Sequence, residues 1–276
     1  MFRNPPVDLV SIELPSATVA LLGGRIVARS PFACLRVPET GRWREKRLPI
    51  ARVALRCPFA STMGRRFENV TGFLLAGGAS RRMGRPKAAL VLSGETMLSR
   101  QIRLLRAVSR QAFIVGATAR FSGGMDGHVE DLGVTILADE LPGRGPLAGI
   151  SAALARTRTE FNLILSCDLP WMEAAFLRFL CRHAFKGGDE VTLPVSRGGG
   201  DEPLCAVYRR RALWAIRTTL AAGQNQVSRS FAKVRVERLT WPEIARAGFP
   251  ARIFDNMNTP DDYQAVLRRL SVVRCQ

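Results

Sequence analysis

Over most of the chain, the hydrophobic residues follow two alternating patterns. Short continuous apolar runs, such as 73–75 and 163–165, have the length of buried β-strands. Between them lie longer segments with apolar residues three or four positions apart, as at Leu98, Ile102 and Leu105, a spacing typical of amphipathic helices. The pattern predicts strands at 73–75, 112–115, 134–137, 162–166, 190–194 and 234–239, and helices at 97–108, 147–155, 174–183, 210–221 and from 260 onward. This alternation predicts an α/β fold, Rossmann-like and doubly wound, with a mainly parallel sheet and helices on both faces.

The last predicted helix carries clear start signals. Thr259 is a suitable N-cap, and Pro260 at the first helical position has no N–H group to leave unpaired. Asp261 and Asp262 place negative charge beside the positive end of the helix dipole. Together these residues predict a helix that begins at 260.

The first 62 residues follow neither pattern. Prolines interrupt their short apolar pieces at positions 5, 6, 15, 31, 38, 49 and 58. We therefore predict two parts: an upstream extension at 1–62, poorly ordered or the product of a mis-assigned start, and a single domain at 63–276. A small accessory segment packed on the domain is the alternative explanation of 1–62.

The charge of the chain favours anionic partners. Its 276 residues carry a formal net charge of +18, with an isoelectric point near 11.2. The basic residues are scattered along the sequence. A dedicated nucleic-acid groove would need them gathered into a tail or stripe. Solvated surface arginines therefore explain the charge at least as well as a nucleic-acid surface does.

Cysteine and histidine positions give no sign of a metal-binding cluster. The six cysteines form no C-x-x-C pair, and the two histidines, His128 and His183, are not spaced as zinc ligands. No apolar stretch approaches the roughly 20 residues that span a bilayer. We expect a soluble cytoplasmic protein with reduced thiols, several of them buried.

A glycine-rich, basic loop follows the first strand of the predicted sheet. Gly77 and Gly78 end the apolar run, and the cations that follow are Arg81, Arg82, Arg85 and Lys87. Glycine permits positive φ and lets a ligand approach the backbone, and the N–H groups of residues 77–80 could form an anion-binding nest. The spacing is neither a Walker A motif nor G-x-G-x-x-G. The loop predicts a phosphate site, with an arginine-rich surface loop as the alternative.

Two acidic residues end later strands of the same sheet. Asp168 follows the apolar run in "LILSCDLP", and Asp139 follows "VTILA". Ligands of doubly wound sheets bind beyond the carboxyl ends of the strands, where carboxylate oxygens suit a hard cation. A helix N-cap is the alternative role for Asp168.

The segment between these acids contains another glycine-rich turn. In "LPGRGPLAGI", residues 141–150, Gly143, Gly145 and Gly149 flank Pro146. The Gly-Pro pair predicts a tight turn before a helix, with exposed backbone groups that could bind the edge of a base. An ordinary strand-to-helix connection would have the same pattern.

Together these stretches resemble the molybdenum cofactor guanylyltransferases, within the broader family of nucleotidyltransferases that attach a nucleoside monophosphate to molybdopterin. The resemblance rests on "LLAGGASRRMGRPK" (74–87), "LADE" (137–140), "GPLAGI" (145–150), "CDLP" (167–170) and "NMNTPDDY" (256–263). These motifs occur in the family's order and are spread across nearly all of residues 71–270. Nothing in 1–62 takes part.

The resemblance implies a role for individual residues. Leu75, Ala76, Gly77 and Gly78 would hold the nucleotide, Lys87 its phosphates, and Asp139 the nucleoside. Asp168 would bind Mg²⁺ and nucleotide, which makes Lys87 and Asp168 the catalytic pair. Asn256 and Asn258 would lie toward the pterin or order the metal site, with turn chemistry before the Thr259 cap as their alternative role.

The resemblance also implies the reaction. GMP would pass from GTP to the terminal phosphate of molybdopterin with release of pyrophosphate, and partners would include molybdoenzyme chaperones or other cofactor-synthesis proteins, with neither nucleic acid nor membrane. "LAGG" and "GPLAG" favour guanine, whereas the proline of "GRPK" also occurs among cytidylyl relatives. A molybdopterin cytidylyltransferase, a sugar-1-phosphate nucleotidyltransferase and a non-catalytic nucleic-acid or regulatory binding protein therefore stay open as alternatives.

Overall fold

The computed structural model describes residues 66–77, 86–116, 132–139, 141 and 143–274, together with the strands β1 (Val10–Leu14), β2 (Ala17–Leu22) and β3 (Arg25–Arg29). The chain divides into two compact units, Met1–Met63 and Gly64–Gln276. In the first unit, β1, β2 and β3 form an antiparallel three-stranded sheet. The sequence analysis predicted no regular element there.

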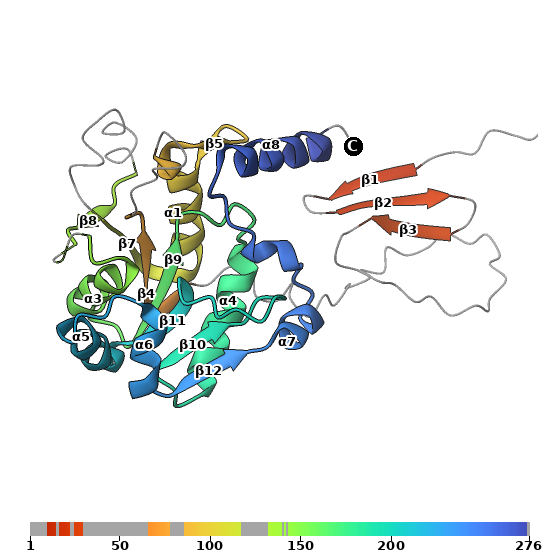
Figure 1. Cartoon of the computed structure of the whole chain (residues 1–276). Coiled ribbons are helices and arrows are strands. Elements are labelled where there is room, and N and C mark those ends of the chain that lie inside the picture. The colour runs from red at the N-terminus through yellow and green to blue at the C-terminus, as the bar shows by residue number, and fades with distance from the viewer. Residues whose placement is uncertain are drawn as a thin grey trace, which may run out of the picture. The chain divides into compact units, whose positions relative to one another are not determined.

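The second unit is built on a seven-stranded sheet in the order β12-β10-β11-β9-β4-β7-β8 (Figure 1). The strands are β4 (Phe67–Leu75), β7 (Ser109–Val115), β8 (Thr135–Leu137), β9 (Phe161–Ser166), β10 (Val191–Pro194), β11 (Cys205–Arg209) and β12 (Val236–Leu239). Strand β11 is antiparallel to both of its neighbours, and the other pairs are parallel. This is a Rossmann-like α/β fold with a mainly parallel sheet, as predicted.

The strand order changes direction beside β4. The chain moves from β4 outward to β7 and β8, then crosses back to β9 on the other side of β4. In doubly wound sheets, ligands bind at such a reversal, beyond the carboxyl ends of the two strands. The residues that follow Leu75 and Ser166 therefore lie at the position where a ligand is expected.

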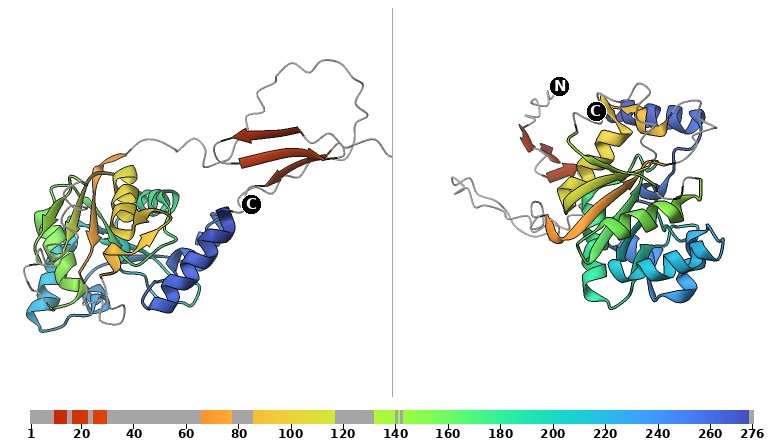
Figure 2. Two further views of the ribbon diagram at one scale, coloured as in Figure 1. Left: turned by 90° about the horizontal axis from the view of Figure 1, so that it is seen from above. Right: turned by 90° about the vertical axis from the view of Figure 1, so that its left-hand side faces the viewer.

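Helices cover both faces of the sheet (Figures 1 and 2). Helices α1 (Met97–Val108) and α4 (Ala174–Lys186) pack on one face, where their apolar residues share a core with Leu74 and Leu165. Helices α3 (Pro146–Arg156) and α5 (Leu213–Ala221) pack on the other face around Phe73 and Ile164. Alternate residues of β4 and β9 thus point to opposite cores, as the two-residue period of a strand requires.

Glycine 72 allows close packing in the middle of β4. A Cβ there would lie 2.8 Å from Ser109 Oγ and 3.1 Å from two side-chain atoms of Leu105. That hydroxyl is buried and donates to the carbonyl oxygens of Leu105 and Gln111, so it cannot move aside easily. Gly72 therefore serves the contact between β4, α1 and β7.

The remaining elements lie mostly in the connections. The hairpin β5 (Val91–Leu92) and β6 (Glu95–Thr96) precedes α1. Helix α8 (Pro260–Arg274) ends the described chain, and α6 (Val227–Ser230) and α7 (Trp241–Arg246) flank β12. The short 3-10 helices are η2 (Lys87–Ala89), η4 (Arg210–Ala212), η5 (Phe231–Lys233) and η6 (Ala251–Phe254). Helix η2 carries Lys87 of the predicted phosphate loop.

Candidate active site

Asp168 stands in the turn that follows β9. Its Oδ1 accepts a 2.5 Å hydrogen bond from the hydroxyl of Ser166, two residues earlier on the same strand. Helix α4 begins only at Ala174 and has Glu173 at its N-cap position, so Asp168 does not cap it. The carboxylate is one quarter exposed and is therefore accessible to a ligand.

Lys87 and Asn258 converge on this carboxylate from distant parts of the chain. Lys87 Nζ lies 3.3 Å from Asp168 Oδ2 and also donates to the side-chain oxygen of Asn258. The ammonium group thus lies between a carboxylate oxygen and an amide oxygen. Both oxygens are hard ligands in the sense of metal coordination. The structure brings together the predicted catalytic pair and one of the two predicted asparagines.

The start of α8 holds Asn258 in place. Thr259 Oγ1 accepts from the N–H of Asp262 at 3.2 Å, and Asp262 Oδ2 accepts from the N–H groups of Thr259 at 2.8 Å and Asn258 at 2.9 Å. This reciprocal cap confirms the predicted role of Thr259. It also fixes the backbone of Asn258 while leaving its side chain for Lys87. By contrast, Asn256 is exposed and makes no side-chain hydrogen bond within the described part of the chain.

The end of β4 offers open backbone beside Asp168. Leu75 is buried and pairs with Ser166, and the N–H of Ala76 donates to the carbonyl of Val115 at 3.0 Å. Gly77 is exposed, and a Cβ there would meet nothing within 4 Å. Its φ does not lie in the positive region that glycine permits, so the fold itself does not require glycine here. Gly78 and the arginines at 81, 82 and 85 lie outside the described residues.

Asp139 lies at the far side of the same sheet edge. It follows β8, three strands from β9, which corresponds to roughly 14 Å at the usual strand spacing. Its Oδ1 accepts from the N–H of Leu141 at 3.0 Å. The structure therefore does not bring Asp139 to Lys87 and Asp168, and a ligand that contacts all three must extend along the edge.

The predicted glycine turn occurs between Asp139 and α3. Gly143 and Gly145 have φ values of +84° and +74°, and α3 begins at Pro146 with Gly145 as its N-cap residue. A Cβ at Gly149 would lie 3.3 Å from a side-chain carbon of Leu75, so this glycine brings α3 close to β4. The turn and helix start are as predicted from "GPLAGI".

Burial and local charge affect two further groups near Asp168. Burial, together with the negative charge of Asp168, raises the pKa of the Cys167 thiol to about 12, so this cysteine is not a thiolate at neutral pH. Burial also raises the pKa of Glu202, and the charges of Asp168 and Asp201 raise it further, against a hydrogen bond with Ser196 that lowers it. Glu202 therefore lies close enough to Asp168 for the two carboxyl groups to interact electrostatically.

Comparison with known proteins identifies this arrangement. The sequence model of the family described as "MobA-like NTP transferase domain" matches residues 72–238, more than half of the chain. The chain belongs to this family. It is a nucleotidyltransferase, and its matched region contains Lys87, Asp139 and Asp168.

The alignments of this MobA-like nucleotidyltransferase with known relatives span most of each relative's length. A protein of Chloroflexus aggregans named "Probable molybdenum cofactor guanylyltransferase" is 34% identical, over 71% of this chain and 93% of the relative. The "Molybdenum cofactor guanylyltransferase" of Desulfosudis oleivorans is 31% identical, over 71% and 94%. The solved structure of "Molybdopterin-guanine dinucleotide biosynthesis protein A" from Archaeoglobus fulgidus has a TM-score of 0.64 at 21% identity and covers 73% of this chain and 99% of that chain. At that identity, the structural likeness shows the fold.

The donor set at Asp168 fits a hard divalent cation. The positive ammonium group of Lys87 is held between the carboxylate of Asp168 and the side-chain amide oxygen of Asn258. Within the described ranges there is no group of three or more His, Cys, Asp or Glu side chains that could hold a metal ion. Mg²⁺ does not need such a group, because it is usually bound through one or two carboxylates, waters and substrate phosphates.

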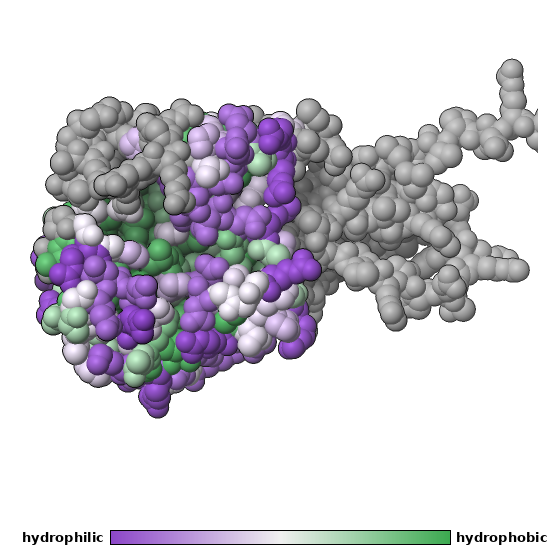
Figure 3. Space-filling model, in the orientation of Figure 1, coloured by the Kyte–Doolittle hydropathy of each residue, from purple (hydrophilic) through white to green (hydrophobic). Residues whose placement is uncertain are grey.

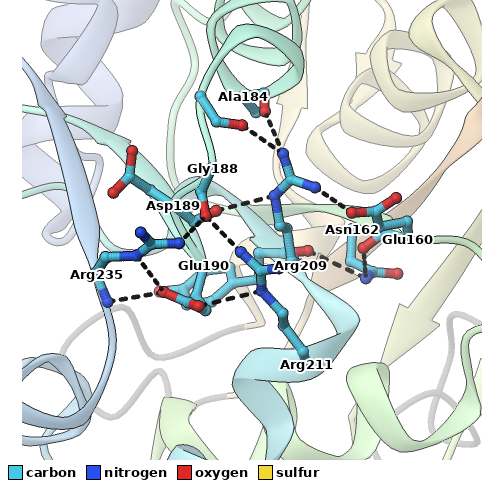
Figure 4. Close-up of polar contacts among 11 residues, drawn as sticks. Glu160, Asn162, Ala184, Gly188, Asp189, Glu190, Arg209, Arg211 and Arg235 are labelled. Atoms are coloured by element: carbon cyan, nitrogen blue, oxygen red, sulfur yellow. Dashed lines mark hydrogen bonds and ion pairs between the residues drawn. The ribbon is translucent and has the colours of Figure 1, made fainter.

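A cluster of arginines and acidic residues lies at the amino end of β9, whereas Asp168 follows its carboxyl end (Figure 4). Arg209 donates to the carbonyl oxygens of Asp189, Gly187 and Ala184 at 3.0, 2.6 and 3.2 Å and pairs with Glu160. On the face shown in Figure 3, hydrophilic residues are spread over the domain between smaller hydrophobic areas. No helix in the described part of the chain is both long and apolar enough to cross a membrane.

Sequence reasoning missed several groups that contact the site. Ser166 was visible as a hydroxyl two residues before Asp168, on the same face of a strand that is otherwise apolar apart from Asn162. Arg100 and Gln101 carried no such signal, because their contact with the turn after β9 depends on how α1 packs. The convergence of Asn258 on Lys87 likewise depends on tertiary structure.

Proposed function

We propose that this nucleotidyltransferase transfers GMP from GTP to the terminal phosphate of molybdopterin, or of its molybdenum-bound form, and releases pyrophosphate. The observation that carries the proposal is the convergence of Lys87, Asp168 and Asn258 at the point where the strand order reverses. The names of the relatives support guanine and molybdopterin as the substrates.

The residues of the site suit phosphoryl chemistry without a general base. The attacking phosphate oxygen is already an anion, so positioning and electrostatic stabilisation suffice. Lys87 would move from Asp168 to the phosphates and stabilise the departing pyrophosphate, while the backbone at Ala76, Gly77 and Gly78 would hold the nucleotide. Asp168 and the amide oxygen of Asn258 would hold Mg²⁺, which supplies positive charge beside the α-phosphate when bound.

The same edge of the sheet offers places for the two ends of the substrates. Asp139 and the glycine turn at 143–145 lie near β8 and α3, where they would contact the nucleoside. Asn256 and Asn258 precede α8 in a segment whose Met257 N–H bonds to the Asp168 carbonyl, and there they would lie toward the pterin. The site would discriminate between bases through hydrogen bonds to the edge of the base. A wrong base would leave buried polar groups of the site unpaired.

The test uses the full chain, molybdenum cofactor, Mg²⁺ and either α-labelled GTP or α-labelled CTP. Label on the pterin from GTP alone is the expected result. Label from CTP alone would identify the cytidylyl activity instead, and label on sugar 1-phosphates but not on the pterin would identify a different acceptor. Absence of label from all of these, in protein shown to be folded, would refute the proposal.

We also propose that the activity resides in residues 63–276. The family match at 72–238 and the compact unit Gly64–Gln276 support this assignment. A fragment of residues 63–276 should transfer GMP at the rate of the full chain. A fragment that is folded but inactive would assign a catalytic role to residues 1–62.

A further inference from the structure

Three consecutive carbonyl groups in the turn after β9 accept hydrogen bonds from outside the turn. The turn comprises residues 168–170, and its carbonyls bond, in order, to the backbone N–H of Met257 at 2.9 Å, the side-chain amide of Gln101 at 2.7 Å and the guanidinium of Arg100 at 3.2 Å. The first donor comes from the segment before α8 and the other two from α1. The backbone beside the Asp168 carboxylate is therefore fixed from two directions.

Gln101 is an unusual member of the buried face of α1. Its neighbours on that face are apolar, as at Leu98, Ile102 and Leu105, and its own side chain is completely buried. Its Nε2 donates to the carbonyl of Leu169, but its Oε1 has no hydrogen-bond partner within the described residues. An unpaired buried polar atom costs about 1–3 kcal/mol, so the core alone does not favour glutamine here.

We propose that Gln101 is a positioning residue for Asp168. Gln101 donates to the carbonyl of Leu169, the residue after Asp168, and so fixes the turn. This turn directs the Asp168 carboxylate toward Lys87 and Asn258. The consequence for catalysis rests on the proposed function of Asp168 as a metal-binding residue. Groups that orient metal ligands in this way typically contribute about 10- to 100-fold to metal affinity or activity.

Asn162 provides a matched control at the other end of β9. It is also completely buried, its Nδ2 donates to the carbonyls of Glu160 and Tyr208 at 3.2 and 3.1 Å, and its Oδ1 has no partner within the described residues. It precedes Asp168 by six residues, roughly 20 Å along an extended chain. Loss of this amide should therefore affect stability in the same way as loss of Gln101 without disturbing Asp168.

The experiment compares full-length Gln101→Met and Asn162→Leu with the wild-type protein. Crystal structures without ligands should show that the contact between Lys87 and Asp168 is lost in Gln101→Met and kept in Asn162→Leu. Electron paramagnetic resonance should show Mn²⁺ affinity reduced about tenfold in Gln101→Met alone, and a high Mn²⁺ concentration should restore most of its transfer rate. An unchanged Asp168 contact in Gln101→Met, or equal losses in both variants, would overturn the proposal.

A second pair of variants covers the case in which Gln101→Met does not fold. Arg100→Leu removes the donor to the next carbonyl, whereas Arg103→Leu, one turn later on α1, removes only an exposed pair with Glu95. Arg100→Leu should weaken Mn²⁺ binding about threefold and Arg103→Leu should leave it unchanged, and equal affinities in the two variants would count against the proposal.

Asp168→Ala separates this inference from the proposed function. If Asp168→Ala binds Mn²⁺ as the wild type does, the metal role of Asp168 fails. The position of the Asp168 carboxylate in Gln101→Met still decides the inference in that case.

Discussion

The two ends of strand β9 use charged residues in opposite ways. At the amino end, Arg209 is only 12% exposed, bonds to three carbonyl oxygens, pairs with Glu160 and lies 4.5 Å above the ring of Phe161. Nearby, Glu190 forms ion pairs with Arg211 and Arg235 and accepts a hydrogen bond from the Arg235 N–H. At the carboxyl end, Lys87 and Asp168 are 20% and 25% exposed, and Lys87 Nζ lies 3.3 Å from Asp168 Oδ2.

This difference separates charge that stabilises the fold from charge that can bind a ligand. The amino end also has an open hollow of about 570 Å³, lined in part by Arg158, Arg210 and Arg211, but its Glu160 is already paired with Arg209. At the carboxyl end, under the proposed function, Lys87 would exchange its protein oxygens for substrate phosphates. Substitutions at the amino end should therefore reduce stability, and those at the carboxyl end should reduce transfer.

The largest expected effect is that of Asp168→Ala. Transfer should fall about 10³-fold or more, because a bound metal ion supplies several kcal/mol of transition-state stabilisation. The carboxylate is partly exposed, so the free energy of unfolding should change by less than about 1 kcal/mol. Turnover of labelled GTP and thermal unfolding would measure the two quantities.

Glu160→Ala is the matched carboxylate change at the other end. It should keep the transfer rate and lower stability slightly, because Glu160 is exposed and only pairs with Arg209. Near-native turnover in Asp168→Ala would remove the distinction between the ends.

A second, smaller effect is expected for Lys87→Ala. Transfer should fall on the order of 10²-fold, the scale of one preorganised electrostatic donor, with little loss of stability. Arg209→Leu should have the reverse effect and leave transfer nearly unchanged. Its free energy of unfolding should fall by about 3 kcal/mol, because three carbonyls lose their charged donor. Chemical denaturation and initial rates should be measured on both variants, and a large fall in transfer in folded Arg209→Leu would contradict the comparison.

The sequence was sufficient to predict the sheet and the placement of Lys87 and Asp168 at one of its edges. Helix α1 was predicted at its observed bounds, because the spacing of its apolar residues is regular. Lys87 and Asp168 were predicted because the loop and the acid both follow buried strands. In this fold, the carboxyl ends of such strands meet.

Other features depend on contacts that no local pattern predicts. Gln101 looks like an ordinary helical residue until α1 packs beside the turn after β9. In the first unit, Val10–Leu14 does alternate apolar and polar residues, but the surrounding prolines outweighed this short signal. Gly77 was predicted to permit positive φ and to let a ligand approach the backbone, and of these only the open approach is seen, since a Cβ there would meet nothing within 4 Å.

A third prediction therefore compares two glycines of the same chain segment. Gly77→Ala should leave stability unchanged, because its Cβ would meet nothing within 4 Å, and should weaken GTP binding about tenfold, or ~1.4 kcal/mol, by obstructing the ligand. Gly72→Ala should cost about 1–3 kcal/mol of stability through overpacking against Ser109 and Leu105. Calorimetric titration with GTP and thermal unfolding would show whether the two effects separate; unchanged GTP affinity in Gly77→Ala would place the nucleotide elsewhere.

The smallest expected effect concerns two glutamates at opposite ends of the sheet. Burial tends to raise the pKa of Glu190, but hydrogen bonds from the Arg235 and Glu190 backbone and the charges of Arg211 and Arg235 outweigh it, so its pKa is lowered. The pKa of Glu202 is raised, first by burial and then by Asp168 and Asp201. At neutral pH, ionised Glu190 stabilises the folded protein, whereas ionised Glu202 destabilises it.

The signs of the two pH effects follow from these shifts. Stability from Glu190 is present above its unfolded pKa of about 4.3 and is lost as the pH falls through its lower folded pKa. Stability linked to protonated Glu202 is present below about 4.3 and is lost as the pH rises through its higher folded pKa. At pH 7, Glu190→Gln should therefore lower the melting temperature and Glu202→Gln should raise it, each by about 2 °C. Both changes in melting temperature should shrink as the pH falls below 4. Changes of the same sign at pH 7 would show that negative charge at Glu190 and at Glu202 affects stability in the same way.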